Sequence, residues 1–208
     1  MIKEEIRQQK INKNIELRCT NPDYNKLMDE ALGYEHRYFK DMTCNNKSIK
    51  DLFKVEYFNE DGTSKGKGDY GDLPYITISD WIIKEKQIKS QGICYNKQLE
   101  IIIKKDLPKL ERKSAFLHEM IHAYEYDLGY SVVGKKIKEI ILISLHKEIE
   151  KQLGKRKLNK VLGTITNVLF WDDNFHSLLF ALKSFDLDIR LNQPFGFVYG
   201  YGKIDFFK

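Results

Sequence analysis

Apolar residues recur at helical spacing in several parts of the chain. Ile2, Ile6 and Ile11 lie among charged side chains, and Asn21 before Pro22 is typical of the start of a second helix. The same periodicity predicts later helices over residues 106–127, 135–153 and 158–170, and after residue 174. Each stretch has an apolar side, so we expect these helices to pack on one another or on a sheet.

Short runs of β-branched and aromatic residues separate the early helices from the later ones. Residues 52–58 predict one strand, and residues 61–68 are so rich in glycine and lysine that they predict a flexible loop. Runs at 75–78, 92–95 and 99–103 predict a small sheet. Because only a short connection separates the last two runs, they are expected to form a hairpin.

These elements predict an α+β fold that is mainly helical, with one domain over residues 1–208. Its parts are a mainly helical N-terminal region (1–60), a sheet followed by a helix (70–130), a helical insertion (131–170) and a C-terminal region (171–208). We expect the last region to hold one helix and then an extended segment, because aromatic residues and glycines alternate near its end.

Composition narrows the class of protein. Nothing approaches the roughly 18 consecutive apolar residues of a membrane-spanning helix, and the N-terminus lacks the apolar stretch of a secretory signal. A cytoplasmic protein without membrane association is therefore expected. The three cysteines are widely spaced and odd in number, which argues against both a disulfide framework and a cysteine zinc site.

Basic residues are concentrated in the predicted insertion, in a chain whose formal net charge is +5. One interpretation is a face that binds the phosphates of a nucleic acid. The other is a set of solvated lysines on surface helices. The residues concerned are Lys135, Lys136, Lys138, Lys155, Arg156, Lys157 and Lys160.

The motif His-Glu-x-x-His is complete at residues 118–122. Residues four apart share one face of a helix, so His118 and His122 can bind one Zn²⁺ ion. Glu119 is turned by about 100° from His118, which directs it to the metal-bound water rather than to the metal. This arrangement predicts hydrolysis of peptide bonds, with Glu119 as the catalytic general base. The alternative is a chance match on an amphipathic helix, against which the apolar residues around the histidines argue.

The segment Leu117–Tyr124 (LHEMIHAY) resembles the active-site helix of SprT-like metallopeptidases, the group that includes Spartan. The likeness extends over residues 91–126 and includes a hairpin that contains Gly92. It implies a zincin-like fold, in which a small sheet packs on the HExxH helix, and three histidine ligands. For some members it also implies proteolysis of proteins attached to DNA. Unlike the usual pattern, this chain has helical segments between the motif and the third histidine and no cysteine beyond Cys94.

His176 is predicted to be the third metal ligand. In the SprT-like family this histidine stands in a His-x-x-x-Phe context, which residues 176–180 match loosely. Elimination favours it as well, because His36 lies far upstream and His146 lies inside the insertion, and a catalytic zinc usually takes three protein ligands. The alternatives are the carboxylates of Glu125, Asp172, Asp173 or a more distant glutamate. Asp172 and Asp173 are also expected to cap the helix that follows.

Three hypotheses for the function follow. The first is an endopeptidase that binds an extended protein or peptide substrate along an edge strand, for which residues 99–103 are the candidate. Tyr199 or Tyr201 would then donate a hydrogen bond in the cleft. The second is a peptidase with one dedicated target, such as an effector or a regulator-cleaving enzyme. The third is a non-catalytic adaptor with a zincin shape, against which Glu119 argues because a structural zinc needs no general base.

Overall fold

The structure is a computed structural model that describes residues 2–42, 54–58, 64–70, 76–129, 132–169 and 176–207. The described part is α+β, as predicted. Its helices are α1 (Ile2–Thr20), α2 (Pro22–Tyr38), α4 (Lys109–Gly129), α5 (Val132–Leu153), α6 (Lys155–Leu169) and α7 (Leu178–Leu191). Its strands are β1 (Lys54–Phe58), β2 (Ser64–Tyr70), β3 (Ile82–Lys86), β4 (Gly92–Tyr95) and β5 (Glu100–Lys104).

The second helix starts as its sequence predicts. The side chain of Asn21 accepts hydrogen bonds from the backbone N–H groups of Asp23 and Tyr24, both at 3.1 Å. Pro22 occupies the first turn, where its missing N–H costs nothing. None of the helices in the described part is long and apolar enough to cross a membrane.

The sheet beside α4 has the strand order β3-β5-β4. The predicted hairpin is confirmed, because β4 pairs antiparallel with β5 from Gly92↔Ile103 to Tyr95↔Glu100. The prediction that residues 99–103 form an edge was wrong, since β3 pairs parallel with the other side of β5. Central strands are buried on both sides, which explains the run of buried isoleucines at 101–103.

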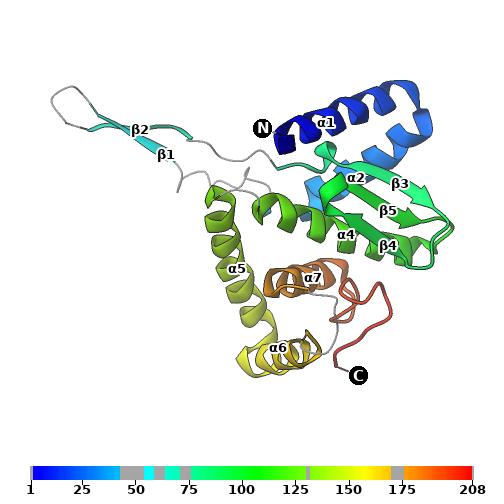
Figure 1. Ribbon diagram of the computed structural model, residues 1–208. Helices are drawn as coiled ribbons and strands as arrows, with labels where there is room; N and C mark the ends of the chain where they lie inside the picture. The colour runs from blue at the N-terminus through cyan, green and yellow to red at the C-terminus, as the bar shows by residue number, and fades with distance from the viewer. Residues whose placement is uncertain are drawn as a thin grey trace.

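Two other predictions about strands were also wrong. The run at 75–78 does not form a strand in its described part; Thr77 instead caps a short 3-10 helix, η1 (Ile78–Asp80), and the strand follows at β3. The glycine- and lysine-rich segment was expected to be a loop, but Ser64–Tyr70 forms β2 and pairs antiparallel with β1. Figure 1 shows this hairpin projecting away from the other elements.

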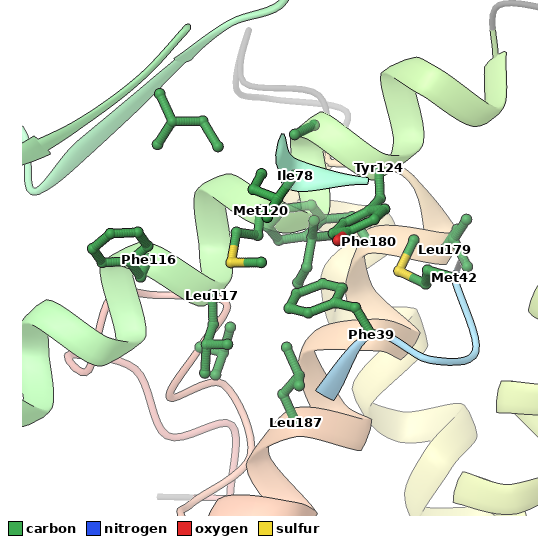
Figure 2. Close-up of a cluster of buried hydrophobic side chains, with 14 of the residues drawn as sticks. Phe39, Met42, Ile78, Phe116, Leu117, Met120, Tyr124, Leu179, Phe180 and Leu187 are labelled. Atoms are coloured by element: carbon green, nitrogen blue, oxygen red, sulfur yellow. The ribbon is translucent and has the colours of Figure 1, made fainter. Parts of the chain in front are cut away.

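Helix α4 lies at the centre of the fold. It contacts β4 and β5 of the sheet, and also α5 and α7 (Figure 1). Side chains of α4 meet those of the neighbouring elements in one apolar cluster, in which Tyr124 stacks on Phe39 with ring centroids 4.8 Å apart (Figure 2). Every residue of α4 from Ser114 to Ile121 is buried, so any polar group in that part of the helix needs a partner inside the protein.

The helical insertion and the C-terminal region pack around α4. Gly154, with φ of +78°, forms the whole break between α5 and α6, so α6 begins at Lys155, three residues before the predicted start of that helix. The extended C-terminal segment was predicted wrongly: residues 193–207 form successive turns without a strand. The positive φ of Gly196 and Gly202 turns the chain back on itself, which an extended segment does not do.

A polar network attaches the N-terminal helix to α4. Asp127, 4% exposed, accepts hydrogen bonds from Trp81 Nε1 at 3.0 Å and Arg7 Nη1 at 3.2 Å. The other guanidinium nitrogen of Arg7 pairs with Asp80 at 2.7 Å. One carboxylate therefore joins α1, α4 and the segment before β3.

We expect Asp127→Ala to lower the free energy of unfolding by about 2 kcal/mol, because it leaves the buried indole N–H of Trp81 without an acceptor. Urea denaturation followed by circular dichroism measures this. The matched control is Asp29→Ala, which removes an exposed carboxylate 3.6 Å from Arg18 and should change stability by less than about 0.5 kcal/mol. Equal stability of the two variants would contradict the role given to Asp127.

Candidate metal centre

The three predicted metal ligands come together from helix α4 and the segment just before α7. His118 and His122 lie one turn apart on α4, and His176 lies just before α7. Their ring centroids are 4.9 to 5.1 Å apart, and one ring nitrogen of each lies within 4.8 Å of the other two. Two nitrogens on one tetrahedral zinc are about 3.4 Å apart, so side-chain movements of about 1 Å bring all three onto one ion.

The protonation of the three imidazoles suits a metal. Burial lowers the pKa of His118 well below its ordinary value, helped by the neighbouring His122 and His176. Burial also lowers the pKa of His122 to about 3 and that of His176 to about 4. All three rings are therefore neutral at pH 7 and each keeps a lone pair for a metal.

The tautomer of His118 is fixed by the C-terminal segment. Its Nδ1 lies 3.0 Å from the carbonyl oxygen of Val198, and a carbonyl can only accept, so Nδ1 carries the proton. Nε2 then has the free lone pair. A backbone carbonyl behind a histidine ligand is a common way to orient the ring toward a metal.

Phe180 forms an apolar wall behind all three imidazoles. Its ring centroid lies 4.7 Å from that of His118, 4.5 Å from that of His122 and 4.1 Å from that of His176. It is fully buried and lies one turn into α7, at the final position of the His-x-x-x-Phe pattern. The ring therefore limits how far each imidazole can turn.

The segment that carries His176 is held to α4 and α5. Ser177, not Asp172 or Asp173, caps α7: its Oγ accepts from Phe180 N at 3.1 Å and donates to Glu125 Oε1. Glu125 in turn pairs with Lys138 of α5 at 2.9 Å. His176 accordingly precedes the cap instead of starting the helix, while Asp172 and Asp173 lie outside the described residues.

Glu119 follows His118 directly in α4 and is 1% exposed. Tyr201 donates a hydrogen bond to its Oε1 at 2.7 Å and stacks on His118 with centroids 3.9 Å apart. Burial raises the pKa of Glu119 to about 7, and the hydrogen bond from Tyr201 opposes that shift. The carboxyl group is thus able both to accept and to release a proton near neutral pH.

Gly92 explains how the hairpin comes so close to Glu119. A Cβ atom at this position of β4 would lie 2.6 Å from Glu119 Oε1 and 2.7 Å from its Cγ. Any side chain there would displace the carboxylate. The glycine of the hairpin is therefore a requirement of the site and not of a turn.

The remaining candidates lie elsewhere or have other partners. His36 is exposed on α2, and His146 of α5 is 3.6 Å from Glu150. Tyr199 stands edge-on to His176, with centroids 4.8 Å apart. Among the basic residues, Lys135 and Lys136 lie near the start of α5, whereas Lys155 to Lys157 follow its end. The length of α5 separates these two groups by about 30 Å.

Sequence reasoning missed the carbonyl of Val198 and the buried carboxylate of Asp188, which accepts a hydrogen bond from the N–H of Val198 at 2.8 Å. A backbone carbonyl leaves no trace in the side-chain pattern. Asp188 did leave one, because Ala181, Phe185 and Asp188 follow at helical spacing and all are fully buried. A carboxylate at a buried position of a helix needs hydrogen-bond donors inside the protein, so its place in the pattern indicates that such donors lie nearby.

The group formed by His118, His122 and His176 can hold a metal ion. No family model, curated protein or solved structure matches this chain. Neutral imidazoles suit zinc, copper, iron and nickel, so the donor set indicates a transition metal without selecting one. Glu119 is not among the donors, but Tyr201 contacts both Glu119 and His118.

We expect His176→Ala to weaken zinc binding at least tenfold, because one of three ligands is lost. The fold should persist, since His176 is only partly buried and precedes the cap of α7. Competition with a chromophoric chelator measures the affinity, and urea denaturation of the metal-free protein checks the fold. His146→Ala is the control. Unchanged affinity of His176→Ala would move the third ligand to a carboxylate.

Proposed function

We propose that this chain is a zinc-dependent metallopeptidase of the SprT-like kind, with a zincin-like arrangement of the small sheet on α4. The observation that carries the proposal is the position of Glu119. It is buried next to His118 in the sequence of α4, and Tyr201 both donates a hydrogen bond to it and stacks on His118; it is not one of the three donors. A purely structural metal site needs no such carboxylate and usually has a fourth protein ligand.

Zinc bound by the three histidines would polarise the scissile carbonyl and lower the pKa of a bound water. Glu119 then accepts a proton from the attacking water and delivers it to the nitrogen of the leaving amine. Val198 holds the ring of His118 during the reaction, and Phe180 keeps the space behind the histidines free of water.

Tyr201 assists Glu119 in this proposal. Its hydroxyl donates to Glu119, which favours the ionised carboxylate that a general base requires. A hydrogen bond from the same hydroxyl to an oxygen that gains negative charge would have to replace the one to Glu119, because the phenol has a single proton to donate. The sequence indicated Tyr199 and Tyr201 equally, and the contact with Glu119 favours Tyr201.

The substrate is proposed to bind along β4. In the described part of the chain, β4 pairs with β5 on one side and leaves its other edge open, so an extended peptide can add there by backbone hydrogen bonds. The close approach of Gly92 to Glu119 brings this edge to the general base. The position of β4 thus replaces residues 99–103 as the proposed docking strand.

Replacing Glu119 by Gln tests the function directly. The amide cannot accept a proton, so we expect hydrolysis to fall at least a hundredfold while zinc affinity stays within about twofold. Detection of new N-termini in a proteome digest compares the variant with the parent, and one or a few cleaved proteins would favour the dedicated-target alternative. Cleavage by Glu119→Gln at the parental rate would refute the mechanism. If the zinc-loaded parent cleaves nothing, the adaptor alternative is supported.

Gly92→Ala tests the approach of β4 to the general base. The added methyl group overlaps Glu119, so we expect hydrolysis to fall roughly ten- to a hundredfold with zinc binding retained, because a misplaced base is inefficient. Steady-state cleavage of a peptide identified in the digest measures this. The control is Gly33→Ala on α2, where the nearest atom to the new methyl is the end of Arg37 at 3.8 Å. Full activity of Gly92→Ala would show that hydrolysis does not depend on the position of the Glu119 carboxylate seen here.

A further inference from the structure

Asp188 is a fully buried carboxylate in the last turn of α7 that the proposed reaction does not use. Its Oδ2 accepts from the backbone N–H of Gly196 and its Oδ1 from that of Val198, each at 2.8 Å. Burial raises the pKa of Asp188 to about 7, and the backbone hydrogen bonds oppose that shift. The carboxylate thus binds two alternate residues of the loop that follows its helix.

The held loop contacts α4 at two points, one turn apart. Ser114 Oγ donates to the carbonyl of Phe197 at 3.0 Å, and His118 Nδ1 donates to the carbonyl of Val198 at 3.0 Å. Because Asp188 binds the N–H of Val198, it acts on the same residue whose carbonyl orients His118. Val198 is thus the single residue that connects Asp188 to His118 through hydrogen bonds.

The loop then turns so that Tyr201 reaches Glu119. Gly200 N donates to Gly196 O at 2.8 Å and Gly202 N to Phe197 O at 2.6 Å, which closes the turn. Tyr201 itself has φ of +54°, a left-handed conformation that is unfavourable for a residue with a side chain. Such strain persists only where surrounding contacts impose it. The residues bound by Asp188 start this turn.

We propose that Asp188 is a positioning residue of the metal centre: it fixes residues 196–198, and through them the tautomer of His118 and the placement of Tyr201 on Glu119. The effect on Glu119 rests on the proposed function, whereas the effect on His118 concerns metal binding alone. Both ends of α7 therefore bear on the site: His176 lies just before its first turn, and Asp188 lies in its last turn.

The rival explanation is that Asp188 only stabilises the fold, and a matched variant separates the two. Asp186 lies two residues away on α7, is 7% exposed and pairs with Lys183 at 2.8 Å and Arg190 at 2.9 Å. Asp186→Asn therefore weakens the packing of α7 without touching residues 196–198. Asp188→Asn offers one acceptor where the loop presents two donors, so one hydrogen bond is lost.

The experiment compares zinc affinity, the absorption spectrum of the Co²⁺-substituted protein and urea denaturation of the metal-free protein. We expect Asp188→Asn to lower zinc affinity about tenfold and to change the Co²⁺ spectrum, as is typical for residues that orient a metal ligand. Asp186→Asn should lower stability at least as much but leave affinity within twofold and the spectrum unchanged. Parental affinity and spectrum in a folded Asp188→Asn would overturn the proposal, and so would an equal loss of affinity in both variants.

Ser114→Ala keeps the test decisive if Asp188→Asn does not fold. It removes the other hydrogen bond that seats the loop on α4, and we expect a threefold or greater loss of zinc affinity with the same spectral change. Parental affinity and spectrum would overturn the proposal. None of these measurements needs peptide hydrolysis, so a cleaving Glu119→Gln variant would end the proposed function and leave this inference standing.

Discussion

The burial of polar side chains on α4 is the constraint on which the rest of the structure depends. His118 and Glu119 are each 1% exposed on a helix whose neighbouring side chains are apolar, and a buried polar group without a partner costs a few kcal/mol. Partners must therefore come from elements far along the chain. Val198 supplies one for His118 and Tyr201 one for Glu119, 80 and 82 residues away.

Helix α7 and the loop after it meet that requirement together. The helix carries the third histidine before its first turn and a buried carboxylate in its last, while Phe180 between them packs on all three imidazoles. A small shift of α7 would consequently move His176 and the hydrogen-bond partner of His118 at once. The rigid apolar cluster of Figure 2, which contains Leu179, Phe180 and Leu187 of α7, opposes such a shift.

Local periodicity predicted the parts of the site that a single element determines. The spacing of His118 and His122 needs only the helical repeat, and the hairpin of β4 and β5 needs only its short connection. His176 was reachable by elimination, because the chain has only five histidines. The strand β3, the central place of β5 and the turns after α7 depend on contacts between distant segments and on left-handed backbone, which no local pattern records. For the same reason the hydrogen bonds of Val198 and Asp188 became visible only in three dimensions.

The insertion takes part in the site that it interrupts in the sequence. Ile137, Ile141 and Leu145 of α5 are buried in the common core, so the helix has a fixed place beside α4 and α7. From that place Lys138 forms an ion pair with Glu125. Glu125 accepts a hydrogen bond from the hydroxyl of Ser177, the residue that directly follows His176. The third histidine is thus anchored by a chain of contacts that starts in the insertion. The residues that separate His122 from His176 along the chain also hold them together in space.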